Sequence, residues 1–235
     1  ASSSAASDVY KRQGPYMPGI FTMEFPYYSQ LFKPVQTSTD ELVDFSLKRL
    51  ELLFKQETSP LDTAAIILET VLGEGGYVPA PTAFLEGIRA ICDKHGILLI
   101  VDEIQAGFGR TGKMFAIEHS GVRPDLMTFA KGFANGYPIS CLVGNKGVMD
   151  IMSPGTLGGT YAGNAVACAA ARATIETFQN ERILENVAER SKQLFSGLEA
   201  IRQTSFGKVI EDIRGMGLMV GVQFASRPGL SLIHI

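Results

Sequence analysis

Two residues that could perform nucleophilic or acid–base chemistry follow two expected buried strands. Asp102 follows the aliphatic residues 97–101 (ILLIV), and Lys131 follows residues 125–130 (DLMTFA). About 30 residues separate them, the length of one strand–helix–strand unit, so both are expected at the carboxyl edge of a parallel sheet, where ligands bind. A lysine against an apolar wall can have its pKa lowered and act as a Schiff-base nucleophile. The alternative is an ion pair between Asp102 and Lys131, and spacing alone favours neither.

The elements that must hold these two residues alternate between strands and helices. Solidly apolar runs are typical of strands that are buried on both faces of a parallel sheet, and they occupy residues 63–70, 97–101, 125–130 and 139–143. Apolar residues at helical spacing predict helices over residues 40–58, 81–95 and 165–201, the last being one long helix or two. This alternation predicts an α/β protein.

Residues 209–224 (VIEDIRGMGLMVGVQF) have a different character. They predict two antiparallel strands joined by a glycine turn, which we interpret as the start of a second domain. We therefore divide the chain into residues 14–175, part of a large domain, and residues 176–229, a connecting helix and the start of a smaller domain.

The two ends of the chain are expected to be foreign to the protein. Residues 8–13 (DVYKRQ) and residues 230–235 (LSLIHI) can be encoded by one DNA word and by its reverse complement. This match indicates a translated library adaptor at each end; the alternative is coincidence between two hexapeptides. We therefore treat residues 1–13 and 230–235 as adaptor-derived scars and expect the native part to begin inside a longer protein.

The composition argues against several classes of function. The chain has 235 residues, 46% hydrophobic and 19% charged, as in ordinary globular proteins. Its 21 basic and 24 acidic side chains give a net charge of −3, which argues against a nucleic-acid partner. No apolar run approaches the roughly 20 residues that cross a membrane. Three widely spaced cysteines suggest neither a disulfide framework nor a metal site, so we expect a reducing compartment.

Two glycine-rich stretches could bind phosphate. The glycines of residues 107–112 satisfy G-x-G-x-x-G, but in a dinucleotide fold the first glycine closes the strand directly, whereas here residues 102–106 intervene. The same stretch is no P-loop, because Met114 stands where the Mg²⁺-binding hydroxyl is needed. Residues 155–163 (GTLGGTYAG) could form a phosphate cradle with the hydroxyl of Thr160, or a plain flexible loop, which we prefer from the residues alone.

Four motifs, in order, resemble the class III pyridoxal-phosphate-dependent aminotransferases, and most of all the 4-aminobutyrate and other ω-amino-acid aminotransferases. They are ETVLGEGGYVPAP, LLIVDEIQAGFGRTGK, PDLMTFAKGFANGYP and GGTYAGNAVACAAA, at residues 69–81, 98–113, 124–138 and 158–171. The resemblance implies the fold-type I architecture, with a mainly parallel seven-stranded sheet in a large cofactor-binding domain and a smaller α/β domain. It also implies a homodimer with active sites at the subunit interface.

The resemblance further implies roles for single residues. Lys131 would carry pyridoxal 5'-phosphate as a Schiff base, and Asp102 would keep the pyridine nitrogen protonated so that the ring withdraws electrons. Ile104 would pack on the face of the ring, and Gln105 would hydrogen-bond its phenolic oxygen. Thr160 would reach the phosphate in the other subunit.

Two glutamates would act on the substrate side. Glu74 matches the residue that covers or releases a substrate-binding arginine in ω-amino-acid enzymes, so that one pocket accepts both an ω-amine and the α-carboxylate of 2-oxoglutarate. Glu69 matches a second glutamate near the cofactor. Thr70 and Ala165 depart from the family pattern, which usually has Pro at both positions.

These roles predict ping-pong transfer of an amino group from an amine or ω-amino acid to a 2-oxo acid. The phosphate loop, the ring-stacking aromatic residue and the substrate arginine are expected outside this chain, so the fragment alone is expected to be inactive. Two alternatives stay open: another class III reaction, such as an aminomutase, a decarboxylase or an ornithine or diamine aminotransferase, or a non-catalytic binding or structural relative. We expect a cytoplasmic protein, with a mitochondrial location not excluded.

Overall fold

The computed structural model describes residues 17–225. The expected adaptor segments, residues 1–13 and 230–235, lie outside the described residues. Residues 17–38 contain turns but no helix or strand. The first described helix, α2 (Thr39–Gln56), confirms the prediction over residues 40–58. It begins where the Ser38 side chain accepts a hydrogen bond from the backbone N–H of Glu41 at 3.2 Å, which satisfies one of the N–H groups that a helix N-terminus leaves unpaired.

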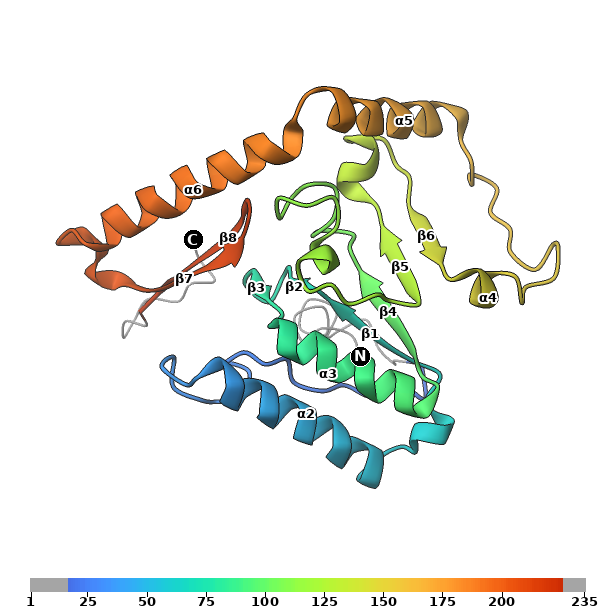
Figure 1. Cartoon of the computed structure of the whole chain (residues 1–235), viewed down its shortest axis with the longest axis horizontal. Helices are drawn as coiled ribbons and strands as arrows, with labels where there is room; N and C mark the ends of the chain where they lie inside the picture. Colours follow the sequence, from blue (N-terminus) through green and yellow to red (C-terminus); the bar gives the residue numbers. More distant parts are fainter. Residues whose placement is uncertain (1–16, 226–235) are drawn as a thin grey trace.

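A four-stranded sheet of order β1-β4-β5-β6 occupies the centre of the molecule (Figure 1). Three strands, β1 (Ala65–Glu69), β4 (Leu98–Asp102) and β5 (Leu126–Phe129), run parallel. The fourth, β6 (Cys141–Gly144), runs antiparallel to β5, because their connection holds only one short 3₁₀ helix and no crossover helix. The α/β prediction with a mainly parallel sheet is therefore confirmed, while the direction expected for residues 139–143 is wrong.

Burial on both faces, the other expectation for these strands, is not complete in any of them: β4 alternates buried and half-buried residues, β5 buries only Phe129, and the two outer strands are the most open. In β1 only Ile66 is buried, and in β6 Leu142 and Val143 are exposed. Both strands are edges of the described sheet, so each lacks a neighbour on one side. The described residues supply four strands of this sheet, where the resemblance implied seven.

The core lies between the sheet and α3 (Thr82–His95), which has α2 beside it (Figure 1). α3 ends at Gly96, whose φ of 71° is the left-handed conformation that favours glycine, as the sequence predicted. Ile88 and Cys92 from α3 meet Leu99 and Val101 from β4, and all four are fully buried. Burying one such large aliphatic side chain contributes about 1.5–3 kcal/mol, so this contact fixes the helix on the strand.

The C-terminal part contains two helices and a hairpin. The predicted helical region 165–201 is two helices, α5 (Ala165–Asn180) and α6 (Ile183–Arg202), separated at Arg182, which has a φ of 50°. The predicted strand pair is the antiparallel hairpin of β7 (Ile210–Met216) and β8 (Met219–Phe224). The proposed division at residue 175 would fall inside α5 and stays a prediction.

The other elements are short. They are η1 (Pro60–Asp62), β2 (Val71–Leu72), β3 (Val78–Pro79), η2 (Ala116–His119), η3 (Lys131–Ala134), α4 (Lys146–Met149) and η4 (Phe206–Val209). Every helix in the described part of the chain is too short or too polar to span a membrane.

Asp125 joins three elements just before β5. Its Oδ2 accepts hydrogen bonds from the backbone N–H of Leu99 in β4 at 2.8 Å and from Arg89 in α3 at 2.7 Å. Its Oδ1 accepts one from the Asn145 side chain, after β6, at 3.0 Å. Burial by itself raises the pKa of Asp125, but these bonds outweigh it and hold the pKa below the ordinary value. The ionised carboxylate therefore stabilises the fold.

We predict that Asp125→Asn lowers the free energy of unfolding at pH 7 by about 1–3 kcal/mol, because the amide cannot accept all three bonds. Since the folded pKa is depressed, this contribution is present above the unfolded value near 3.8 and disappears as the pH falls through the folded pKa. The difference in unfolding free energy between wild type and variant, measured by denaturant unfolding, should therefore narrow as the pH falls from 7 to 3.

Asp93→Asn is the matched control for this measurement. Asp93 also pairs with Arg89, at 2.8 Å, but its side chain is 67% exposed, so its loss should cost under about 0.5 kcal/mol. A difference between wild type and Asp125→Asn that is as large at pH 3 as at pH 7 would contradict the assignment.

Candidate active site

The parallel register places three polar residues in one row at the carboxyl edge of the sheet. Glu69 of β1 is paired with Asp102 of β4, which is paired with Thr128 of β5. Residues in register on parallel strands point to the same face of the sheet. The Thr128 hydroxyl oxygen is buried and has no hydrogen-bond partner among the described residues. This edge thus presents two carboxylates and a hydroxyl side by side.

Local hydrogen bonds orient both carboxylates. The Oδ1 atom of Asp102 accepts a hydrogen bond at 2.9 Å from the backbone N–H of Ile104, as aspartates do where a chain turns. An Oε2 atom of Glu69 accepts one from Gly73 at 3.3 Å, in the loop between β2 and β3. The Glu69 carboxylate is therefore held by the loop after β2, and the Asp102 carboxylate by the loop after β4.

Lys131 lies two residues beyond the end of β5 and is exposed. Its Nζ donates a hydrogen bond to the side-chain oxygen of Gln105 at 2.7 Å. The alternative reading of the sequence, an ion pair between Lys131 and Asp102, does not form within residues 17–225, where no salt bridge of Lys131 occurs. The amine is held by a neutral amide, which leaves its charge without a carboxylate to neutralise it.

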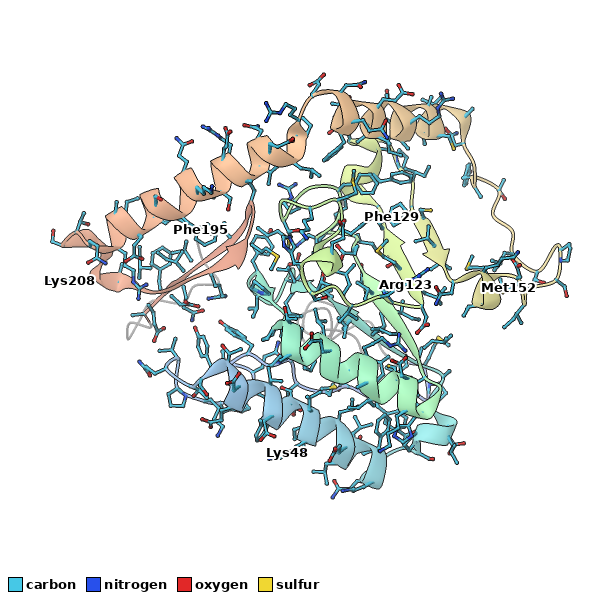
Figure 2. All side chains as sticks on the ribbon, in the orientation of Figure 1. Lys48, Arg123, Phe129, Met152, Phe195 and Lys208 are labelled. Carbon is cyan, nitrogen blue, oxygen red and sulfur yellow. The ribbon has the colours of Figure 1, made fainter. Side chains whose placement is uncertain are left out.

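The backbone at Lys131 adopts a conformation that non-glycine residues rarely take. Its φ is 42°, and such left-handed residues cost about 1–2 kcal/mol unless their surroundings hold them. Phe129 and Phe133 flank it, and their ring centroids are 5.0 Å apart; Phe108 lies 5.5 Å from the first and 5.0 Å from the second. Phe129 is the last residue of β5 and is labelled in Figure 2. These aromatic contacts anchor both sides of Lys131.

Sequence reasoning missed this aromatic cluster. Its further members are Phe115, which contacts Phe108 and Phe129, and Phe178 of α5, which contacts Phe108. The available signal was the recurrence of phenylalanine in the two motifs that carry the site, GFGRTGKMF and TFAKGF.

The glycine-rich residues 107–112 pack against other elements instead of forming a nucleotide loop. A side chain at Gly109 would clash with the ring of Phe178, and one at Gly217 in the hairpin would clash with the backbone of Thr111. Lys113, the residue a P-loop would direct at phosphate, donates to the carbonyl of Glu118 at 3.2 Å. Close packing therefore accounts for Gly109, and the φ of 94° at Gly112 is a left-handed conformation that favours glycine.

Glu74 and Thr160 are not joined to Lys131 by any hydrogen bond or ion pair within the described residues. Glu74 is exposed on the loop between β2 and β3, which also contains Gly73. Thr160 is exposed in the loop of residues 150–164, which extends away from the sheet between α4 and α5 (Figure 1). Ile104 is half-buried beside Asp102.

A cavity of about 710 Å³ lies against β1. Its walls are mostly apolar residues of β1, of α2 and of residues 19–23, and Glu69 and Asp102 line it. Lys131 and Gln105 do not, so this cavity does not enclose the lysine. Within residues 17–225, no group of three or more His, Cys, Asp or Glu residues is arranged to hold a metal ion.

Gly73 offers a test of the Lys131–Gln105 contact. A Cβ atom at this position would overlap the amide nitrogen of Gln105, the movable end of a flexible side chain. We predict that Gly73→Ala keeps the fold but displaces Gln105, so that Lys131 reacts about threefold faster with acetic anhydride, as the loss of one hydrogen bond implies. Mass spectrometry of the modified peptide measures this rate.

Gln105→Ala should give the same acceleration, and the double variant no more, because both changes remove one contact. The control is Gly197→Ala in α6, where an added Cβ meets nothing within 4 Å. A wild-type rate in both Gly73→Ala and Gln105→Ala would show that the contact does not restrain the amine.

Comparison with known proteins connects this geometry to a family. The protein-family model described as "Aminotransferase class-III" matches residues 1–233 of this chain. The 5-aminovalerate aminotransferase DavT of Pseudomonas putida is 45% identical over 209 residues, which cover 89% of this chain and 48% of DavT. The 4-aminobutyrate aminotransferase GabT of Escherichia coli is 42% identical over 209 residues, with coverage of 89% and 48%.

Solved structures agree in fold. An (S)-enantioselective ω-transaminase from Thermomicrobium roseum superposes with a TM-score of 0.84 at 32% identity, covering 93% of this chain and 49% of its own. The taurine:2-oxoglutarate aminotransferase of Bifidobacterium kashiwanohense, solved with PLP and glutamate, gives 0.83 at 33% identity, covering 92% and 48%. This chain thus spans about half the length of the relatives it matches, and its mostly parallel α/β sheet has the fold-type I architecture. The chain belongs to the class III aminotransferase family, as its four motifs predicted.

Proposed function

We propose that this chain is part of a pyridoxal-phosphate-dependent aminotransferase that transfers an amino group from an ω-amino acid to a 2-oxo acid. The observation that carries the proposal is the Lys131–Gln105 hydrogen bond beside the row that contains Glu69 and Asp102. DavT and GabT are named for 5-aminovalerate and 4-aminobutyrate, and both compounds are ω-amino acids. A 4-aminobutyrate-like donor and a 2-oxoglutarate-like acceptor therefore fit best.

The side chains at the carboxyl edge fit pyridoxal phosphate in their chemistry. Lys131 supplies a primary amine, Asp102 a carboxylate for the ring nitrogen, and Gln105 an amide for the phenolic oxygen. The buried Thr128 hydroxyl, in the row of Asp102, has no partner among the described residues and is available to a bound group. Ile104, next to these residues, would pack on the ring. When bound, pyridoxal phosphate withdraws electrons from the carbon that carries the amino group.

The residues of this chain would bind and orient the cofactor and substrate and move protons. Asp102 holds a proton on the ring nitrogen, and the hydrogen bond from Ile104 keeps its carboxylate oriented. Lys131 binds the cofactor and, once released from it, moves a proton at the substrate carbon as general base and acid. Gln105 restrains the amine between these steps. Glu69 and Glu74 face the substrate, and Glu74 governs whether an arginine outside this chain meets an α-carboxylate.

We further propose that the enzyme is a homodimer in which Thr160 serves the phosphate site of the other subunit. Several apolar side chains near Thr160 are exposed in this chain: Ile151 (78%), Leu157 (69%), Tyr161 (88%) and Val166 (60%). Such clusters of exposed apolar side chains favour a subunit interface.

The free cysteines Cys92, Cys141 and Cys168 suit the reducing cytoplasm, where we place the protein. Residues 14–175 and 176–229 would form parts of its large and small domains.

Borohydride reduction of the complete enzyme with pyridoxal phosphate tests the cofactor role. We expect a single pyridoxyl group on Lys131, located by peptide mass spectrometry, because borohydride reduces a Schiff base to a stable amine. Lys131→Ala should abolish both the label and transamination. Lys113→Ala is the control, since that amine bonds the Glu118 carbonyl and should leave the label in place. Labelling at another lysine, or at none, would refute the proposal.

Glu74→Gln tests the choice of substrate. If Glu74 neutralises an arginine while an ω-amino acid is bound, its loss should lower kcat/KM for 4-aminobutyrate by about tenfold, the effect of about 1.4 kcal/mol, and spare 2-oxoglutarate. The two half-reactions are measured separately by absorbance, with Glu86→Gln, another exposed glutamate, as the control. Equal losses in both half-reactions would remove Glu74 from this role.

A further inference from the structure

Glu103 is the one fully buried carboxylate among residues 17–225, with an exposed fraction of 1%. It makes no salt bridge within that range; instead its oxygens accept three hydrogen bonds. Oε1 accepts from the Thr70 hydroxyl at 3.1 Å and from the backbone N–H of Ile117 at 2.8 Å, and Oε2 accepts from the backbone N–H of Ala116 at 3.0 Å. A buried carboxylate without such partners would cost several kcal/mol.

The three donors to Glu103 come from two separate segments, and Glu103 itself lies in a third. Thr70 follows the last residue of β1, Glu103 follows the last residue of β4, and Ala116 and Ile117 begin η2. The backbone of Glu103 adds two further bonds: its N–H donates to the Thr128 carbonyl at 2.8 Å, and its carbonyl accepts from Gly107 at 2.9 Å. This one residue therefore joins the carboxyl ends of three parallel strands and closes the loop of residues 104–115.

We call the hydrogen bonds that Glu103 makes with Thr70, Ala116 and Ile117 the junction. Three of the site residues lie next to it in the sequence. Glu69 immediately precedes Thr70, Asp102 immediately precedes Glu103, and Gln105 is two residues farther along the loop that Glu103 closes. If the junction opens, the loop can move, and the Gln105–Lys131 and Ile104–Asp102 hydrogen bonds move with it. A buried group that touches neither the amine nor the cofactor can thus determine the geometry of those that do.

We propose that Glu103 and Thr70 are positioning residues, whose hydrogen bond holds Glu69, Asp102 and Gln105 in the arrangement that receives cofactor and substrate. The statement that they position residues for cofactor and substrate rests on the proposed function. The statement that they hold the three segments together rests on the hydrogen bonds alone. The resemblance described above implies a proline at this position, which would have no hydroxyl to donate, whereas this chain has Thr70.

A matched pair of substitutions isolates the hydroxyl. Thr70→Val has nearly the same shape but cannot donate, so Glu103 retains two donors; Thr70→Ser restores the hydroxyl. In the complete enzyme we expect Thr70→Val to speed deuterium exchange in residues 104–117 and to weaken pyridoxal-phosphate binding by about tenfold each, since a hydrogen bond to a buried charged acceptor is lost. Thr70→Ser should remain near wild type in both measurements.

Two further variants serve as a negative control and as a second test of the Glu103 hydrogen bonds. Thr177→Val is the control, because the Thr177 hydroxyl donates only to the Ala173 carbonyl within α5, at 2.9 Å. Glu103→Gln should match or exceed Thr70→Val, since its amide cannot accept from Thr70, Ile117 and Ala116 together. If Glu103→Gln fails to fold, the comparison of Thr70→Val with Thr70→Ser still tests the proposal.

Each outcome bears on a separate statement. A lower Tm in Thr70→Val with wild-type exchange in residues 104–117 and wild-type cofactor affinity would reduce Thr70 to a structural role and overturn the proposal. So would a Thr70→Ser variant that behaves like Thr70→Val. Absence of any cofactor label on Lys131 in the wild type would instead defeat the proposed function, and the exchange rates would still test the junction.

Discussion

The parallel register of β1, β4 and β5 is the constraint on which the rest of this structure depends. It brings Glu69, Asp102 and Thr128, which are far apart in sequence, into one row, and it places Lys131 just beyond the same edge. The register is itself fixed by the apolar contact of α3 with β4, because a slip by one residue would turn the buried face of a strand outwards. Chemistry at this edge therefore depends on packing well away from it.

Two hydrogen-bonded carboxylates add precision that apolar packing cannot supply. Asp125 joins α3, β4 and the residue after β6 near the amino end of β5, and Glu103 joins three segments at the carboxyl end of β4. Hydrogen bonds are directional, and a buried polar group tolerates few alternative partners, so such groups specify one arrangement. The sheet is thereby fixed at both ends, and the residues to which we assign chemical roles lie at the carboxyl end.

The sequence allowed the elements, and the position of Asp102 and Lys131 at the carboxyl edge, to be predicted, but not the partners of these two residues. Apolar runs and helical spacing report which residues are buried, and this sufficed for α2, α3, β4 and the hairpin of β7 and β8. They do not report strand direction, so the antiparallel β6 was missed. Nor could they show that Lys131 bonds Gln105 rather than Asp102, that its backbone is left-handed, or that Glu103 bonds Thr70 across 33 residues. Those features depend on how loops fold back over the sheet.

The C-terminal hairpin contacts both loops that border the carboxyl edge. Gly217 meets the backbone of Thr111, and Arg214 donates to the carbonyl of Gly76 at 2.9 Å, in the loop that bears Glu74. Gly221 lies so close to that same carbonyl that a Cβ atom would clash with it. Gly217 and Gly221 of the hairpin, and Gly107 of the motif GFGRTGK, are thus explained by close approach of backbones. Because the backbones of the hairpin and of the loop that carries Glu74 are in close contact, a shift of the hairpin must also shift that loop.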